Sequence, residues 1–140
     1  MQDCIFCKIV RGEIPSVKVY ESDSVLCLLD VAPAVRGHSL VIPKKHVENI
    51  LEIPEDMAAG MHEAMRRVGR GIIQGLNADG FNVGMNNFQA AGQVVMHAHW
   101  HLIPRFHGDG LQLWPQHKYD SDEQMQVFAQ KISSALSSPG

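Results

Sequence analysis

Residues 92–104 have the sequence GQVVMHAHWHLIP, in which His97, His99 and His101 alternate with apolar residues. Alternation with a period of two is typical of a β-strand, because residues i, i+2 and i+4 then share one face. We therefore predict a strand over Met96–Ile103. One face of this strand would carry three imidazoles, and the other would carry apolar side chains.

This row of histidines is hard to explain as core packing, because each imidazole has two ring nitrogens that need partners. A strand rises about 3.3 Å per residue, so His97 and His101 would lie ~13 Å apart, too far for one metal ion with bonds of about 2 Å. A neutral imidazole, with a pKa near 6.5, is a good nucleophile and acid–base group at pH 7. The row therefore indicates nucleophilic catalysis at phosphorus, with Gly92–Val95 turning backbone N–H groups toward the phosphate.

The rest of the sequence predicts an α+β fold with a five-stranded, mainly antiparallel sheet. Apolar runs and alternation predict the other four strands at Lys18–Glu21, Ser24–Asp30, His38–Ile42 and Phe81–Asn86. Apolar residues spaced by three and four predict a long helix over Pro54–Gly75 and a second helix that begins with a capping box at Ser121. We expect a fraying tail over Ser133–Gly140.

Composition points to a globular domain that acts on a small molecule. The chain has 140 residues, of which 45% are apolar and 19% charged, and we expect one domain over residues 1–140. A net charge of -3 gives no electrostatic reason to expect nucleic acid or an anionic membrane as a partner. The first residues lack the pattern of a signal peptide, so we expect a cytoplasmic protein whose three cysteines are thiols or metal ligands.

The histidine row also carries a family resemblance. The segment His97–Ile103 resembles the H-φ-H-φ-H-φ-φ signature of the histidine-triad (HIT) superfamily, where φ is apolar, and Gly92-Gln93 precedes it as in the Hint branch. Three further segments are similar to Hint-like bacterial proteins in order and spacing: Leu29-Asp30, Gly37–His46 and Asn86-Asn87. The resemblance implies a HIT-like fold with one long helix and a C-terminal helix. It also implies a homodimer that forms through the helix Pro54–Gly75 and a central strand.

The resemblance further implies a role for each matching residue. His99 matches the nucleophile that attacks the α-phosphorus of a nucleotide ester or amide and forms a nucleotidyl-histidine, which water then hydrolyses. His101 and His38 would line the phosphate site and help to orient His99. Phosphate oxygens would be held by Gln93 and by the amides near Val94 and Val95. The ribose would be bound by Asp30 and Asn86, and the purine by Ile5, Phe6, Leu28 and Val31.

These roles imply a hydrolase or transferase that acts on purine nucleoside monophosphate conjugates such as adenosine phosphoramidates. Position 94 is a departure, because several Hint proteins have a serine there that assists the departing amine, whereas this chain has Val94. The proton for the leaving group must then come from His99, another histidine or water. Two alternatives are a dinucleoside polyphosphate hydrolase and a nucleotide-binding scaffold protein with little turnover.

A second motif lies near the N-terminus, where Cys4-Ile5-Phe6-Cys7 forms a C-x-x-C pair. This pair is half of a metal site, and zinc with two thiolates commonly takes two imidazoles. By resemblance to bacterial relatives that carry the same pair, His46 and His97 complete a closed, structural zinc site. The alternative is a pair of reduced thiols in the first turn of a helix. Cys27 lies in an apolar run and is expected to be a packed thiol.

Overall fold

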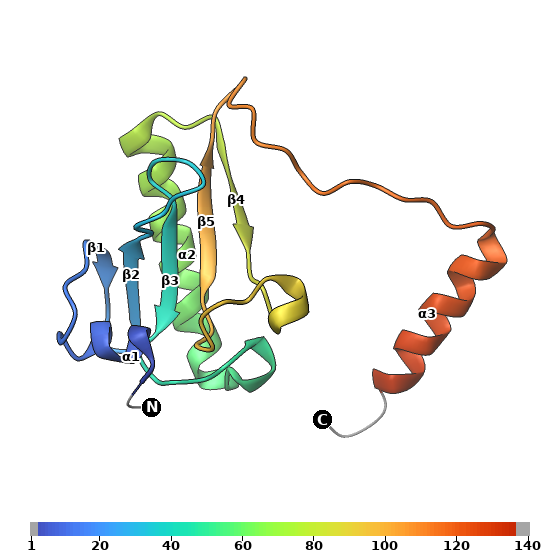
Figure 1. The fold of residues 1–140 in the computed structure, drawn as a ribbon, viewed down its shortest axis with the longest axis horizontal. Helices are drawn as coiled ribbons and strands as arrows, with labels where there is room; N and C mark the ends of the chain where they lie inside the picture. Colours follow the sequence, from blue (N-terminus) through green and yellow to red (C-terminus); the bar gives the residue numbers. More distant parts are fainter. Residues whose placement is uncertain (1–2, 137–140) are drawn as a thin grey trace. The chain divides into compact units, whose positions relative to one another are not determined.

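Five antiparallel strands form one sheet in the order β1-β2-β3-β5-β4 in the computed structural model, which describes residues 3–136 (Figure 1). The strands are β1 (Lys18–Glu21), β2 (Val25–Leu29), β3 (Ser39–Pro43), β4 (Gly80–Gly84) and β5 (Trp100–Arg105). The prediction of an α+β fold with a five-stranded antiparallel sheet is therefore confirmed.

Three α-helices and two short 3₁₀ turns accompany the sheet. The α-helices are α1 (Ile5–Val10), α2 (Glu55–Leu76) and α3 (Asp122–Leu136), and the turns are η1 (Ile50–Glu52) and η2 (Gln89–Ala91). Pro54 lies in extended backbone just before α2, and Asn77 ends that helix in the left-handed conformation. No helix in residues 3–136 is long and apolar enough to cross a membrane.

Both faces of the sheet are buried, which explains the nearly continuous apolar run in β2. Val25 and Cys27 face α2 and pack with its buried residues Met61, Val68 and Ile72. Leu26 and Leu28 point the other way and pack with Phe6 and Ile9 of α1. The sheet thus holds α1 on one face and α2 on the other (Figure 1).

The chain forms two compact units, residues 1–109 and residues 110–140. The first unit contains the sheet, α1 and α2. The second contains α3, whose start is capped as the sequence predicts: Ser121 Oγ accepts a hydrogen bond from the Gln124 N–H at 3.1 Å. That all 140 residues make one domain stays a prediction.

The structure corrects two sequence predictions. The strand expected over Met96–Ile103 begins only at Trp100, so His97 and His99 precede β5 and do not share a strand face with His101. The chain leaves the sheet there because the Ala98 N–H bonds to the Val47 carbonyl at 2.7 Å, in a loop far along the chain. The fraying tail is wrong over Ser133–Leu136, which belong to α3, and its remaining residues, 137–140, lie outside the described part.

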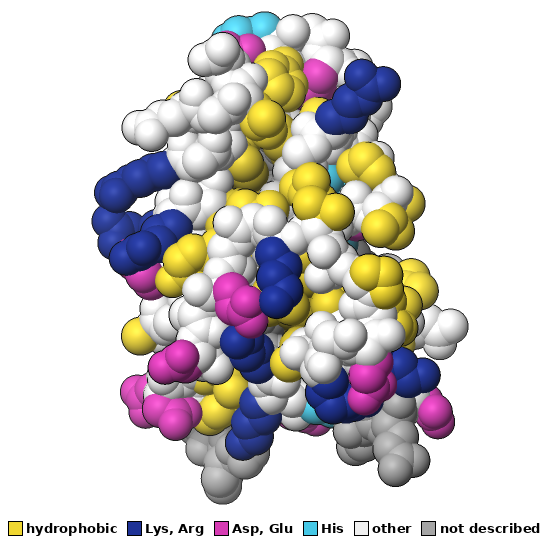
Figure 2. Space-filling view, turned by 90° about the vertical axis from the view of Figure 1, so that its left-hand side faces the viewer, with side chains coloured by type: hydrophobic (Ala, Val, Ile, Leu, Met, Phe, Trp, Pro, Cys, Tyr) yellow, Lys and Arg dark blue, Asp and Glu magenta, His cyan; other side chains and the backbone are white. Residues whose placement is uncertain are grey.

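Surface charges of opposite sign lie close to one another. Arg11 pairs with Glu13 at 2.7 Å, and Lys44 pairs with Glu21 at 2.8 Å. On the face shown in Figure 2, basic side chains in dark blue are interspersed with acidic side chains in magenta.

Gly37 lies in the β2–β3 loop at a position that only glycine fits. Its φ is +96°, and a Cβ there would lie 2.5 Å from Leu76 Cδ1 and 3.2 Å from Pro104 Cγ. We predict that Gly37→Ala lowers the free energy of unfolding by at least about 1 kcal/mol, because it adds backbone strain and a clash.

Gly71 is the matched control, because it lies exposed in α2 with nothing within 4 Å of a built Cβ. Gly71→Ala should raise the free energy of unfolding by up to about 1 kcal/mol through helix propensity. Urea denaturation of both variants checks the pair. Equal behaviour of the two variants would contradict the packing described around Gly37.

Candidate functional site

Two histidines from neighbouring strands form the first part of the site. His38 is the residue before β3, and His101 lies in β5, opposite Leu40 of β3. His38 Nε2 lies 2.8 Å from His101 Nδ1 and 3.8 Å from Asp30 Oδ2. Asp30 follows β2 directly, and its backbone N–H bonds to the His38 carbonyl at 2.9 Å. The end of β2 and the start of β3 thus bring a carboxylate and two imidazoles together.

His99 is held with one ring nitrogen free. Its Nδ1 lies 2.7 Å from the His97 carbonyl oxygen. A carbonyl can only accept, so Nδ1 carries the proton and the lone pair of the neutral ring is on Nε2. The His99 ring lies edge-on to Phe6 and beside His101, with ring centroids 5.1 and 5.0 Å apart respectively. This is the protonation pattern that a nucleophilic imidazole needs.

His97 is fixed by a second backbone carbonyl. Its Nε2 lies 2.8 Å from the Pro43 oxygen, so Nε2 carries the proton and Nδ1 has the lone pair. That Nδ1 lies 3.4 Å from Cys4 Sγ and 3.6 Å from Cys7 Sγ. His46 Nδ1 lies 3.4 Å from Cys7 Sγ. The structure therefore brings together all four residues of the predicted metal site, with ligand atoms within 4.8 Å of one another.

The donor set fits zinc. A tetrahedral zinc ion with bonds of about 2.3 Å to sulfur and 2.0–2.1 Å to nitrogen separates a sulfur from a nitrogen ligand by about 3.5 Å. Three of the four S···N distances here are 3.4, 3.4 and 3.6 Å. The Pro43 carbonyl orients the His97 ring in the way that outer-shell acceptors orient metal-bound histidines. Four protein ligands leave no open position on a tetrahedral ion.

Burial keeps His38 and His101 neutral. Burial lowers the pKa of His101 to about 4, with further lowering by His99 and His38. Burial also lowers the pKa of His38, while the Asp30 carboxylate opposes that effect. At pH 7 both His38 and His101 are therefore uncharged.

Cys27, which is completely buried, has its pKa raised by burial to about 12, as expected of a packed thiol.

Gln93 braces the loop that precedes the histidines. Its Oε1 accepts a bond from the Phe88 N–H at 2.8 Å, and its Nε2 donates to the carbonyls of Glu48 and Val95 at 2.6 and 3.1 Å. Gln93 is only 3% exposed. In this structure Gln93 shapes the predicted phosphate loop, and a direct contact between its side chain and phosphate stays a prediction.

Other predicted nucleotide contacts are less closely grouped. Asn86 Nδ2 lies 3.5 Å from the Gly92 carbonyl, at the entrance of the same loop. Phe6 and Leu28 are buried in the core, whereas Val31 is 99% exposed. Ile5 lines a cavity of about 410 Å³ together with Val94, Val95 and Met96, among others. The role of these apolar residues in purine binding stays a prediction.

The fold and the site can now be compared with known proteins. A family model described as "HIT domain" matches residues 11–108. The chain belongs to the HIT family. This HIT protein is 41% identical to "Protein hit" of Bacillus subtilis over 140 residues, which is 98% of this chain and 97% of that protein. It is 38% identical to the adenosine 5'-monophosphoramidase of Schizosaccharomyces pombe over 95% of this chain and 98% of that one.

Solved structures agree with this membership. A crystal structure from Streptococcus mutans UA159 has a TM-score of 0.90 and 44% identity, and covers 97% of this chain and 87% of that chain. A Zn-bound histidine triad family protein from Mycobacterium smegmatis has a TM-score of 0.76 and 38% identity, over 95% of this chain and 98% of that chain. The HIT protein thus shares its fold with both.

The lowered pKa of His101 predicts how stability depends on pH. The ordinary value of 6.5 applies in the unfolded chain, and the folded value is about 4. Below pH 6.5 the unfolded chain therefore binds the extra proton, so this contribution to stability is complete above pH 6.5 and is lost as the pH falls toward 4. We predict that His101→Gln makes the decline of the unfolding free energy between pH 7 and 5 shallower, by at most about 1.4 kcal/mol per pH unit.

His62, exposed on α2, provides the control for this measurement. His62→Gln should leave the pH dependence of urea unfolding as it is in the wild type. If His101→Gln and His62→Gln give the same slope, His101 is not the buried neutral histidine described above.

Proposed function

We propose that this HIT protein hydrolyses or transfers the nucleotidyl group of purine nucleoside monophosphate conjugates, such as adenosine phosphoramidates, through a nucleotidyl-histidine on His99. The observation that carries this proposal is the bond from His99 Nδ1–H to the His97 carbonyl, which leaves Nε2 with its lone pair. A relative named adenosine 5'-monophosphoramidase supports the substrate class.

The reaction has two displacements at one phosphorus atom. In the first, His99 Nε2 attacks the α-phosphorus, the bond from phosphorus to the leaving group breaks, and the leaving group takes a proton from another histidine or from water. In the second, water attacks the same phosphorus and gives one proton back to that donor, the bond to Nε2 breaks, and the nucleoside monophosphate departs while His99 regains its lone pair.

Hydrogen bonds around His99 favour the intermediate. When Nε2 is bonded to phosphorus and Nδ1 keeps its proton, the ring carries a positive charge. The His97 carbonyl, 2.7 Å from Nδ1, then accepts a charge-assisted bond, which is stronger than the bond to the neutral ring. His38 and His101 line the phosphate side of the site, and Asp30 and Asn86 bind the ribose side. Gln93 holds the loop whose amides at Val94 and Val95 face the phosphate oxygens.

His99→Ala tests the nucleophile. The variant should lose multiple turnover and lose the covalent nucleotidyl label that acid quenching traps, because the covalent route is deleted. Its affinity for AMP should stay within roughly tenfold of the wild type, because few ground-state contacts are lost. His62→Ala, which removes an exposed imidazole from α2, is the control and should keep the label. Multiple turnover by His99→Ala would exclude His99 as the nucleophile.

A substrate panel separates the remaining alternatives. Values of kcat/KM for an adenosine phosphoramidate, a diadenosine polyphosphate and a nucleotidyl sugar should differ by about two orders of magnitude in favour of the phosphoramidate. A preference for the diadenosine compound would assign the chain to dinucleoside polyphosphate cleavage. Binding of AMP without turnover of any of the three would make it a nucleotide-binding protein.

The same proposal includes a structural zinc ion held by Cys4, Cys7, His46 and His97. Bound there, zinc would stabilise the attachment of α1 to the loop before β5 without taking part in the two displacements. The fit of the donor set and the Zn-bound relative from Mycobacterium smegmatis support this site. Because His97 Nδ1 binds the metal and the His97 carbonyl orients His99, the ion would stiffen the site from behind the nucleophile.

Cys4→Ser tests the zinc site. Protein purified under reducing conditions should contain close to one zinc per chain, and Cys4→Ser should lower both the zinc content and the Tm. Cys27→Ala, at a buried thiol outside the cluster, should lower the Tm but keep the zinc. Activity that falls in strict proportion to zinc removal, with the protein still folded, would instead make the ion catalytic.

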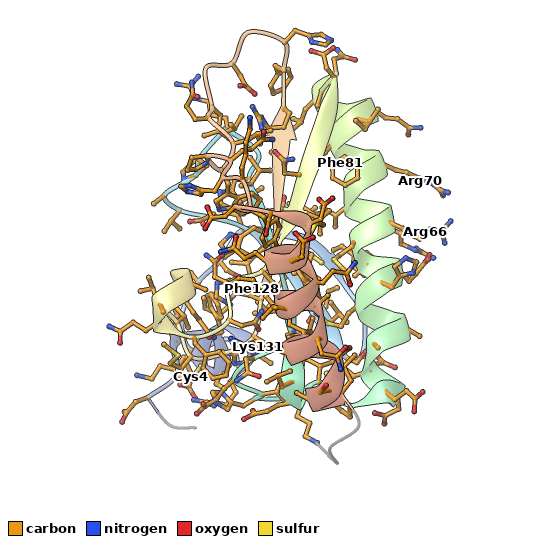
Figure 3. All side chains as sticks on the ribbon, turned by 90° about the vertical axis from the view of Figure 1, so that its right-hand side faces the viewer. Cys4, Arg66, Arg70, Phe81, Phe128 and Lys131 are labelled. Atoms are coloured by element: carbon orange, nitrogen blue, oxygen red, sulfur yellow. The ribbon has the colours of Figure 1, made fainter. Side chains whose placement is uncertain are left out.

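The proposal also includes a homodimer. The central strands β2, β3 and β5 are paired on both edges, so the strand edges available to a second copy are those of β1 and β4 rather than of a central strand. Phe81 of β4 points toward α2, whereas Arg66 and Arg70 point away from the sheet (Figure 3). Exposed apolar side chains on these two elements are Ile73, Leu76, Phe81 and Val83. Sedimentation equilibrium of the full chain would measure the mass of the assembly.

A further inference from the structure

His38 faces a backbone donor. The Ala34 N–H, in the β2–β3 loop, lies 3.1 Å from His38 Nδ1. A backbone amide can only donate, so Nδ1 must be the accepting nitrogen. In a neutral ring the proton is then on Nε2. Asp30 favours the same arrangement, because its Oδ2 lies 3.8 Å from Nε2 and attracts a proton there.

The proton on His38 Nε2 determines which nitrogen of His101 carries a proton. His38 Nε2 lies 2.8 Å from His101 Nδ1, and since His38 Nε2 has the proton, it donates and His101 Nδ1 accepts. The proton of His101 is therefore on its own Nε2. Reversing the order would bring the Ala34 N–H against a protonated Nδ1 of His38, with no acceptor between them.

We infer that Ala34 is a positioning residue whose backbone N–H fixes the order of hydrogen bonds from Ala34 to His38 to His101. The order makes His101 present an N–H group, rather than a lone pair, to the phosphate. Phosphate oxygens accept hydrogen bonds and are repelled by a lone pair, so only this order binds them well. The statement about phosphate rests on the proposed function, whereas the order of the hydrogen bonds does not.

The same hydrogen-bond order distinguishes two clusters that both contain possible metal ligands. Asp30, His38 and His101 also offer ligand atoms within 4.8 Å of one another, as the cysteine cluster does. A metal there would need the lone pair of His38 Nε2, which this order replaces with a proton. In the cysteine cluster the reverse holds, because the Pro43 carbonyl accepts a hydrogen bond from His97 Nε2–H and leaves the lone pair on Nδ1. Of these two clusters, the cysteine cluster is therefore the one whose histidine presents a lone pair to a metal.

The hydrogen-bond order can be measured without substrate. We expect long-range ¹H–¹⁵N spectra of the ¹⁵N-labelled, zinc-loaded protein at pH 7.5 to show His38 and His101 protonated on Nε2. We also expect scalar couplings across the hydrogen bonds from Ala34 N to His38 Nδ1 and from His38 Nε2 to His101 Nδ1. A proton on His38 Nδ1 would overturn the inference, whatever the activity of the protein.

Two variants isolate the Ala34 amide. Ala34→Pro removes the N–H, and we expect His38 to show a mixture of protonation on its two nitrogens, with kcat lowered at least tenfold and KM within threefold. Ala34→Gly keeps the N–H and should keep the wild-type protonation of His38. An Ala34→Pro protein in which His38 stays protonated on Nε2 alone would overturn the role of Ala34. If that variant does not fold, the couplings in the wild type decide.

The outcome is separable from that of the proposed function. A protein that shows the expected couplings but forms no nucleotidyl intermediate would contradict the proposed function and leave the hydrogen-bond order intact. A protein that forms the intermediate with His38 protonated on Nδ1 would contradict the role of Ala34 and leave the nucleophile intact.

Discussion

The bond from His97 Nε2 to the Pro43 carbonyl, 2.8 Å long, is the interaction on which the rest of the site depends. It joins the end of β3 to the loop before β5 and fixes the ring of a completely buried histidine. With that ring fixed, Nδ1 faces the two thiols of α1 and the carbonyl of the same residue faces His99. One residue therefore positions both the cysteine–histidine cluster and the ring of His99.

A single rule explains how three neighbouring histidines, His38, His97 and His99, take different roles. Each ring has one nitrogen bonded to a group whose role is fixed, and the other nitrogen is left for chemistry. A carbonyl beside His97 and another beside His99 leave lone pairs, whereas the Ala34 amide beside His38 leaves a proton. Backbone carbonyl and amide groups thus determine which nitrogen of each imidazole carries the proton, although the imidazoles themselves are chemically identical.

This dependence on the backbone explains what could be predicted from the sequence. The strand Lys18–Glu21 and the five-stranded antiparallel sheet could be predicted from local patterns and the order of the elements, and the cysteine pair indicates a candidate metal cluster. The shape of the loop from Gly92 to His99 could not be predicted, because it depends on Val47 and Glu48, which lie far away in the chain. The alternation of histidines is typical of a strand, but the Ala98 N–H bonds to the Val47 carbonyl and not to a neighbouring strand. The acceptor at Pro43 and the donor at Ala34 are backbone groups, so the identities of the side chains do not predict them.

Sequence separation gives the cysteine cluster a further property. Cys4 and His97 are 93 residues apart, and Cys7 and His46 are 39 apart, yet their ligand atoms meet. Closing so long a loop costs chain entropy before any contact compensates for it. During synthesis from the N-terminus, α1 leaves the ribosome long before the loop that carries its last partner. The Cys4 and Cys7 thiols can therefore meet His97 only after β1 to β4 have been made, although α1 itself packs against β2 and β3.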